Sequence, residues 1–318
     1  MSFAFIVNPH SASGKTKKKW DSMLEPALKA KNVDYKVFFT EHREHAIQLA
    51  REALETGGFK NVVSVGGDGT FHEIVNGVLD SDGQMIKAGA NVGIICSGTG
   101  SDFIKTLGIP QDPLQAIDIL LKENVRTIDV LKGNFMSMDG NPITKFCINV
   151  ADAGIGGDVV DRVNRSKKIF GGKATFMLAE LRVIMGFKRK PISLQIDSEE
   201  PRDLELLQIF FSNCTYNGGG LRAGYKASPD DGWMDVFYME GLSTGYAASN
   251  FSKLYKDDAI IEALIKKNEP HMFYTKAKNA RLVPRNEKAV LLDFDGEMVG
   301  KAPLDIEIIP SAVNVLSP

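Results

Sequence analysis

The segment Gly66-Gly67-Asp68-Gly69-Thr70 combines residue types that suit phosphate binding. It follows the β-branched run 62–65, which predicts a buried strand, and it precedes apolar residues at helical spacing (Phe71, Ile74, Val75 and Val78). The N-terminus of such a helix presents backbone N–H groups and the positive end of the helix dipole, and glycines let an anion approach the backbone closely. Asp68 would repel a phosphate unless it faced a shared Mg²⁺. The segment therefore predicts a phosphate-bearing ligand and a divalent cation.

Thr70 and Glu73 have a second interpretation, because Thr-x-x-Glu fits a capping box. In that arrangement the Thr70 hydroxyl and the Glu73 carboxylate would each accept a hydrogen bond from the other's backbone N–H. This structural function would explain both residues without a ligand. It would not explain the glycines and Asp68.

Two further polar turns follow predicted strands in the first half of the chain. Residues 8–16 follow a strand at 3–7 and end in Gly14-Lys15-Thr16, but Pro9 replaces the first glycine of a P-loop. Lys15 is the phosphate-side candidate, whereas the lysines at 17–19 are expected to be a solvated helix start. Residues 97–103 form a second glycine-rich turn after a strand at 91–96.

The order of elements predicts the fold of the first half. Further strands at 35–39 and 126–130 and helices at 44–55 and 113–122 give an alternating pattern. This pattern is typical of a mostly parallel, Rossmann-like α/β sheet covered on both faces. Ligands of such sheets bind outside the carboxyl ends of the strands, so the three polar loops could converge on one ligand.

After residue 130 the pattern changes to strands without intervening helices, which predicts an antiparallel β-sandwich. We expect helical insertions at 158–187 and 244–267, a boundary near 129–133 and a hinge at Lys132-Gly133-Asn134. The predicted domains are an α/β domain at 1–130 and a β-sandwich domain at 131–304, with the tail 305–318 packing back on the first domain. The expected strands lie at 146–150, 192–196, 204–211, 233–238, 289–294, 304–309 and 313–316.

Composition limits the classes of function. The 318 residues are 43% hydrophobic and 25% charged, as in ordinary globular proteins, and the net charge of −2 argues against a dedicated nucleic-acid binder. Cys96, Cys147 and Cys214 are odd in number and widely spaced, which predicts neither a disulfide framework nor a zinc pair and favours a reducing compartment. No apolar run approaches the roughly 18 residues of a membrane span. We therefore expect a soluble cytoplasmic protein that can still touch a membrane surface.

Three segments of the second half could carry chemistry or be purely structural. Asp230-Asp231-Gly232 fits either a turn or a loop stabilised by a cation. Asp295-Gly296 is a strong hairpin signal, and it places Glu297 at the rim of a sheet. The apolar segment 175–187, flanked by lysines and arginines, fits a buried helix or the wall of a lipid pocket facing an anionic leaflet.

Taken together and in order, these segments resemble the diacylglycerol-kinase catalytic family, specifically its soluble bacterial lipid kinases. The resemblance covers nearly the whole chain. It depends on Asn8-Pro9 with Ser13-Gly14-Lys15, Gly66 to Thr70 with Glu73 and Asn76-Gly77, Gly98 to Phe103, Ile128-Asp129-Val130, Pro229 to Gly232 with Asp235, and Asp295-Gly296-Glu297. One departure is Ser101, where the family usually has asparagine.

The resemblance implies an ATP site in a cleft between the two domains. It implies Glu297 as the residue that deprotonates a lipid hydroxyl, with Asp68 taking part in catalysis through Mg²⁺. A structural Mg²⁺ would match the Asp231 side chain with backbone oxygens of Ser228 and Trp233. The positions that match nucleotide contacts are Asn8, Ser13, Gly14, Lys15, Thr40, Gly66, Gly67, Asp68, Gly69, Thr70, Glu73 and Thr99.

The resemblance also implies the reaction and the partners. The protein is expected to be an ATP- and Mg²⁺-dependent lipid kinase that acts on lipid at the inner face of the membrane, with conversion of diacylglycerol to phosphatidic acid as the first expectation. The sequence leaves the lipid acceptor and the oligomeric state open, and a homodimer is one option. Two alternatives stay open. One is an NAD kinase, which shares the Gly-Gly-Asp-Gly-Thr loop, and the other is a catalytically silent nucleotide-binding regulator.

Overall fold

The structure is a computed structural model that describes residues 2–97, 101–158 and 186–318. The chain forms two compact units. The first unit contains Met1–Val130, Pro229–Asp231 and Ile309–Pro318, and the second contains Leu131–Ser228 and Gly232–Ile308. Thr99 and the apolar segment 175–185 lie outside the described residues, as does most of the insertion predicted at 158–187.

The first unit is built on a parallel sheet with the strand order β2-β1-β3-β4. The end of β14 joins its edge, where Val315 pairs in parallel with Val92 of β4. Every residue of β3 and β4 is buried, as expected for central strands covered on both faces. The strands are β1 (Ser2–Val7), β2 (Asp34–Phe39), β3 (Asn61–Gly66), β4 (Asn91–Cys96) and β14 (Glu297–Leu316).

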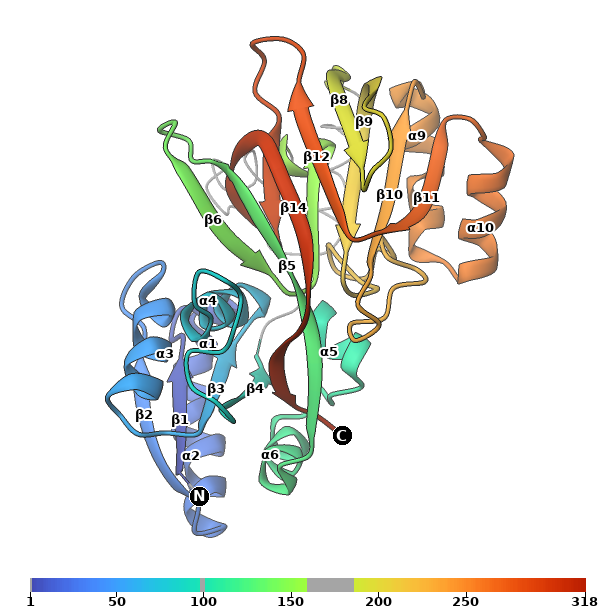
Figure 1. Cartoon of the computed structure of the whole chain (residues 1–318). Coiled ribbons are helices and arrows are strands. Elements are labelled where there is room, and N and C mark those ends of the chain that lie inside the picture. Colours follow the sequence, from blue (N-terminus) through green and yellow to red (C-terminus); the bar gives the residue numbers. More distant parts are fainter. Residues whose placement is uncertain (1, 98–100, 159–185) are drawn as a thin grey trace. The chain divides into compact units, whose positions relative to one another are not determined.

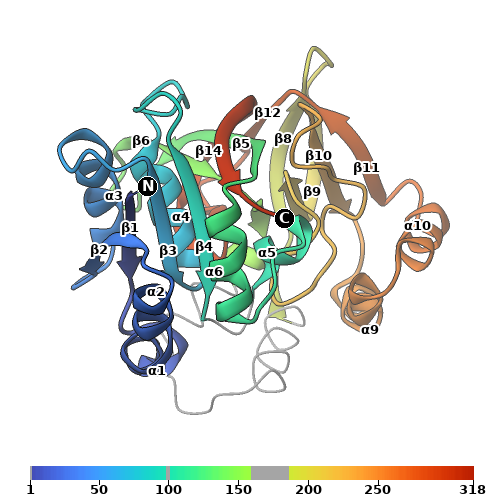
Figure 2. The same cartoon turned by 90° about the horizontal axis from the view of Figure 1, so that it is seen from below.

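Helices cover both faces of this sheet (Figures 1 and 2). Trp20, Leu24 and Leu28 pack with Ile117 and Leu120 on one face, and α3 and α4 pack on the other. This arrangement confirms the predicted α/β architecture. The helical segments are α1 (Ser11–Lys19), the π-helical η1 (Trp20–Leu24), α2 (Glu25–Ala30), α3 (His45–Glu55), α4 (Asp68–Val78), α5 (Asp102–Leu107) and α6 (Pro113–Lys122).

The second unit is an antiparallel β-sandwich whose strand pairings close into a ring. The ring runs β9-β7-β13-β14-β12-β8 and returns to β9. Leu131, Phe211, Leu282, Phe294 and Leu304 belong to its buried core. The strands are β5 (Val125–Met136), β6 (Pro142–Cys147), β7 (Val150–Gly154), β8 (Lys190–Ile196), β9 (Arg202–Ser212), β10 (Met234–Glu240), β11 (Met272–Ala277), β12 (Asn279–Pro284) and β13 (Leu291–Phe294), with part of β14.

The helical insertion predicted at 244–267 is confirmed. It consists of α9 (Thr244–Asn250), the 3₁₀ turn η2 (Phe251–Tyr255) and α10 (Asp258–Lys267). Ile261 and Leu264 of α10 belong to one apolar cluster with Phe237 of β10 and Met272 of β11. Figure 1 shows α10 beside β11. In the described part of the chain, no helix has the length and apolar character needed to cross a bilayer.

Several strand predictions for the second half were wrong in detail. The strand predicted at 146–150 is broken between β6 and β7, because the N–H groups of Ile148 and Asn149 donate to the Asp295 carboxylate instead of a neighbouring strand. The hinge predicted at Lys132-Gly133-Asn134 lies inside the continuous strand β5, paired with β6. The strands predicted at 304–309 and 313–316 form one strand, β14, and β11 and β12 were not predicted.

Candidate active site

Three loops at the carboxyl edge of the parallel sheet are joined by hydrogen bonds. Asn8, after β1, donates through Nδ2 to Thr70 Oγ1 over 3.0 Å. The N–H of Ser97, after β4, donates to the Gly66 carbonyl at the end of β3 over 2.8 Å. The Ser97 hydroxyl lies 2.7 Å from the buried Thr16 hydroxyl. These hydrogen bonds show that the loops meet, and the common ligand on which they were predicted to converge stays a prediction.

The hydroxyl cluster of Ser11, Thr16 and Ser97 was not predicted from the sequence. Ser11 Oγ lies 2.6 Å from Thr16 Oγ1 and donates to the Asn8 carbonyl over 2.9 Å. These contacts fix the loop after β1 to the loop after β4. The sequence signal is weak, because serine and threonine after a strand are common in any loop.

The predicted phosphate contacts after β1 lie in a left-handed backbone segment. Ala12, Ser13 and Gly14 have φ values of 51°, 57° and 81°. Left-handed backbone costs a non-glycine residue on the order of 1–2 kcal/mol, and such strain concentrates at ligand-binding loops. Lys15 follows this segment and is exposed, so its ammonium group is accessible from solvent. Of the neighbouring lysines, Lys17 forms an exposed ion pair with Asp21.

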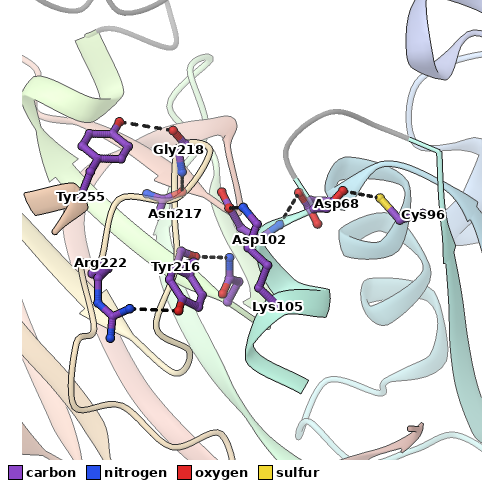
Figure 3. A network of polar contacts seen from close by, with 11 residues as sticks. Asp68, Cys96, Asp102, Lys105, Tyr216, Asn217, Gly218, Arg222 and Tyr255 are labelled. Carbon is purple, nitrogen blue, oxygen red and sulfur yellow. Dashed lines mark hydrogen bonds and ion pairs between the residues drawn. The ribbon is translucent and has the colours of Figure 1, made fainter. Parts of the chain in front are cut away.

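The Gly66–Thr70 loop carries the end of β3 directly into α4. Gly67 has the extended conformation of an N-cap, and Asp68 is the first helical residue. A Cβ on Gly66 would lie 2.5 Å from Thr70 Oγ1, so only glycine lets the Thr70 side chain pack there. The Asp68 carboxylate interacts favourably with the positive end of the helix dipole. One of its oxygens, Oδ2, also accepts a hydrogen bond from the Asp102 N–H over 3.3 Å (Figure 3).

The predicted capping box of Thr70 and Glu73 was wrong. The helix begins two residues before Thr70, and Thr70 Oγ1 accepts its hydrogen bond from Asn8. Glu73 instead caps the neighbouring helix α3, because its two carboxylate oxygens accept from the N–H groups of Glu44 (2.9 Å) and Ala46 (3.1 Å). The N-cap residue of α3, Glu44, makes no side-chain cap of its own.

This cap gives a stability prediction. We expect Glu73→Ala to lower the free energy of unfolding by about 1–2 kcal/mol, because two backbone N–H groups lose a charged acceptor. Urea denaturation measures the change, and Glu55→Ala is the control, since its exposed ion pair with Arg51 should contribute below about 1 kcal/mol. A Glu73→Ala protein as stable as the control would contradict the capping role. ATP affinity of the same variant tests the predicted nucleotide contact.

Thr40 is another residue predicted to contact nucleotide, and Asp102 lies in the glycine-rich segment Gly98 to Phe103 on which the resemblance depends. Thr40 follows β2 and is buried, and its N–H donates to the Val7 carbonyl over 2.9 Å. Asn8 and Thr40 therefore end adjacent parallel strands. Asp102 is buried and forms an ion pair with Lys105 at 2.7 Å (Figure 3).

Glu297 lies in the second unit, directly after a tight turn. Asp295 and Gly296 have φ values of 56° and 85°, which identifies the two-residue type I′ hairpin that the sequence predicted. Glu297 is half-buried, begins β14 and pairs with Phe294. The carboxylate of Glu297 therefore stands at the rim of the β13–β14 hairpin.

The Asp295 carboxylate is structural, because it accepts hydrogen bonds from backbone amides between β6 and β7. Its donors are the N–H groups of Ile148, Asn149 and Val150, at 3.1, 2.8 and 3.3 Å. Burial and this carboxylate raise the pKa of the Cys147 thiol well above its usual value. Cys147 therefore stays a protonated thiol and donates to Asp295 over 3.0 Å.

The residues predicted to hold a structural Mg²⁺ are divided between the units. Asp231 belongs to the first unit. Two contacts hold the residues before it in that unit: Asp129 N–H donates to the Pro229 carbonyl over 2.7 Å, and Arg126 forms an ion pair with Asp230 at 2.8 Å. Ser228 and Trp233 belong to the second unit. Hard cations prefer such a set of donors, one carboxylate with backbone carbonyls. The Mg²⁺ site itself stays a prediction. Among the described residues, no three or more His, Cys, Asp or Glu side chains gather as metal ligands.

Asp235 is another residue on which the family resemblance depends, and its contacts within the second unit are structural. It is fully buried, accepts a hydrogen bond from Tyr274 Oη over 2.8 Å and lies 3.9 Å from Lys276 Nζ. Burial and the Asp235 charge raise the pKa of Tyr274, which therefore acts as a hydrogen-bond donor.

Residues 2–133 match the diacylglycerol kinase catalytic domain, and residues 149–317 match the YegS C-terminal NAD kinase beta sandwich-like domain. The chain therefore belongs to the diacylglycerol kinase family. The relatives include the candidate lipid kinase YtlR of Bacillus subtilis (strain 168), 27% identical over 330 residues and covering 98% of both chains. A candidate lipid kinase of Staphylococcus carnosus (strain TM300) is 28% identical over 258 residues, covering 79% of this chain and 75% of its own.

The fold is also that of a solved structure. The crystal structure of a candidate diacylglycerol kinase from Bacillus anthracis str. Sterne aligns with a TM-score of 0.73 at 24% identity, over 100% of this chain and 97% of that one. At this identity the likeness supports the fold alone.

Proposed function

We propose that this protein is a lipid kinase that transfers the γ-phosphoryl group of ATP to a lipid hydroxyl, with diacylglycerol as the acceptor and phosphatidic acid as the product. The observation that carries the proposal is the hydrogen-bonded convergence of three loops at the carboxyl edge of the parallel sheet. Such an edge, with a helix N-terminus and a glycine-rich turn, suits a phosphate-bearing ligand. Membership of the kinase family supports a nucleotide donor.

The first unit would bind and orient the phosphoryl donor. Backbone N–H groups of the Gly66–Gly69 turn would hold phosphate oxygens, and the exposed Lys15 would offset their charge. Asn8 would position the turn, since its side chain holds Thr70. Phosphoryl transfer depends mainly on such positioning and on charge neutralisation.

The residues of this edge fit a hard divalent cation. Asp68 offers a carboxylate beside the phosphate-binding turn, and oxygen ligands are those that Mg²⁺ prefers. Mg²⁺, when bound, would neutralise charge on the phosphate oxygens. A bound Mg²⁺ would also explain why Asp68, a negatively charged residue, follows two glycines at a predicted anion site.

The second unit would supply the base. Glu297 would accept the proton of the lipid hydroxyl as the hydroxyl oxygen forms its bond to the γ-phosphorus and the bond from that phosphorus to ADP breaks. The type I′ turn before Glu297 sets the backbone position from which its side chain extends. Because the acceptor is a lipid, we propose that the protein works in peripheral contact with a membrane surface.

A phosphorylation assay tests this function and its alternatives. The protein is incubated with γ-labelled ATP, Mg²⁺ and either diacylglycerol vesicles, a total lipid extract or NAD. We expect label in phosphatidic acid, and mass spectrometry of the extract would identify any other acceptor. Label in NADP without labelled lipid would support an NAD kinase, and tight ATP binding without any transfer would support a silent regulator. Either result would overturn the proposal.

A further inference from the structure

Two buried carboxyl groups face each other next to the hairpin that carries Glu297. Asp152 of β7 and Asp293 of β13 are directly opposite in the antiparallel register, and their exposed fractions are 3% and 2%. Directly opposite side chains lie on the same face with Cβ atoms about 4.5–5.5 Å apart. Ala151, Ala153, Leu292 and Phe294 alternate with them and belong to the sandwich core, so the two carboxyl groups lie on the other face of this sheet.

Polar groups connect this pair to its surroundings on both sides. Asp152 accepts hydrogen bonds from Gln208 Nε2 of β9 (3.1 Å) and from Asn217 Nδ2 (3.4 Å). Asp293 Oδ1 accepts from the N–H of Gly296 over 2.7 Å, across the turn that precedes Glu297. Asp293 therefore holds the backbone of that turn directly.

Among the residues that the structure describes, the charged groups that act on this pair are all negative. Neither Asp152 nor Asp293 forms an ion pair with a lysine or arginine of the described residues. The charged groups that act on Asp293 are Asp152 across the strands and Asp295 and Glu297 in its own hairpin. Two opposed carboxylates buried without a cation cannot both be ionised at acceptable cost, so one of them must keep its proton. The two amide donors favour the ionised form at Asp152, which leaves the proton on Asp293.

We propose that Asp152 and Asp293 are positioning residues that together keep one proton and thereby hold the β13–β14 hairpin in the geometry that presents Glu297. Loss of that proton would place two like charges across the paired strands β7 and β13 and push the strand that carries the hairpin away from β7. The proposal deepens the proposed function, because it assumes that Glu297 is the base. It makes the activity depend on a proton that is never transferred to substrate.

The pKa shifts of the pair agree in direction with this geometry. Burial raises the pKa of Asp152 to about 7, and burial together with the Asp152 charge raises the pKa of Asp293 well above its usual value. A raised pKa in the folded state means that the stabilising effect of each proton is complete below the unfolded value of about 3.9. The Asp152 proton is lost as the pH rises through about 7, which leaves the single proton on Asp293, and that proton is lost as the pH rises through the raised pKa of Asp293. Both the stability of the hairpin and the turnover should therefore decline on the alkaline side.

Asp293→Asn tests the proposal because it imitates the protonated residue. Its carbonyl oxygen can accept from Gly296 N–H, and its side chain stays uncharged at every pH. We expect turnover within about threefold of the natural protein at neutral pH, and a variant-to-natural turnover ratio that rises at least threefold as the pH passes through the raised pKa of Asp293, which carboxyl NMR locates. Asp305→Asn is the control, since Asp305 is exposed on β14 and pairs with Arg281. For this control we expect a ratio that does not change with pH.

Asp293→Ala removes the acceptor for Gly296 N–H and provides the second comparison. We expect its turnover to fall about tenfold at every pH with an unchanged KM for ATP, a loss that Asp293→Asn does not show. An Asp293→Asn profile that follows the natural protein, or equal turnover in the alanine and asparagine variants, would overturn the proposal.

Carboxyl NMR separates this proposal from the proposed function. With ¹³C-labelled aspartate and no substrate, the natural protein should show a carboxyl titration near pH 7 that is absent in Asp152→Asn, and a second one at higher pH that is absent in Asp293→Asn. Absence of the second titration in the natural protein would overturn the retained proton. Presence of both titrations in a protein without lipid kinase activity would instead show that the pair exists and the proposed function is wrong.

Discussion

Replacing Glu297 with glutamine is expected to lower turnover by roughly a hundredfold or more, because general-base catalysis typically contributes about 10²–10⁴. Glutamine keeps the size and shape of the side chain but cannot accept the hydroxyl proton. The hairpin should be preserved, since its turn is held by the hydrogen bond from Gly296 N–H to Asp293 and by the hydrogen bonds that the Asp295 carboxylate accepts. Turnover is measured with labelled ATP and diacylglycerol vesicles, and ATP affinity by calorimetry.

Glu307→Gln is a matched control for this experiment. Glu307 lies on the same strand, β14, and is exposed, so the same change in charge should leave turnover unaffected. ATP affinity should be unchanged in both variants, because the proposed donor residues belong to the first unit. If Glu297→Gln turned over like Glu307→Gln, Glu297 would have no place in the mechanism.

The elements that the sequence predicted well are those determined by local patterns. The strand, glycine-rich turn and helix around Gly66 follow from hydrophobic periodicity and from the conformational freedom of glycine, and β4 and α6 have the expected bounds. The Asp295-Gly296 hairpin was predictable for the same reason, since a type I′ turn requires particular residues at two adjacent positions.

The predictions that failed depend on partners far away in the chain. Glu73 caps α3 instead of its own helix, because tertiary packing brings the N–H groups of Glu44 and Ala46 to its carboxylate. The break between β6 and β7 follows from hydrogen bonds to Asp295, about 150 positions later in the sequence. No spacing rule relates such residues, so a local pattern could not reveal them.

The Asp152–Asp293 pair illustrates the same limit at the candidate site. Each aspartate alone interrupts a strand-like run and would ordinarily be placed in a turn or on a solvated face. Only the β7–β13 register shows that they are opposed and buried. The roles proposed for Asn8, Lys15, Thr40 and Glu297 stay predictions, since the structure fixes their positions and not their ligands.

Replacing Asp68 with asparagine is expected to lower turnover by roughly a hundredfold or more, as is typical when a group that stabilises transition-state charge is removed. The amide keeps the shape of the side chain and an oxygen that can accept from Asp102 N–H. Stability should fall by no more than about 1 kcal/mol, which is the usual contribution of an acidic residue to the first turn of a helix. A large loss of turnover without a matching loss of stability would therefore identify a functional charge.

The Mg²⁺ dependence of this variant distinguishes a cation ligand from a helix-capping charge. In the natural protein Mg²⁺ should raise ATP affinity, and in Asp68→Asn the Mg²⁺ concentration that gives half-maximal turnover should rise about tenfold or more, because a neutral amide binds a hard cation less strongly than a carboxylate. Asp82→Asn is the control, since Asp82 is exposed and lies after α4. If Asp68→Asn kept natural turnover and Mg²⁺ dependence, Asp68 would only stabilise the N-terminus of α4, and the cation would have to bind through other oxygens.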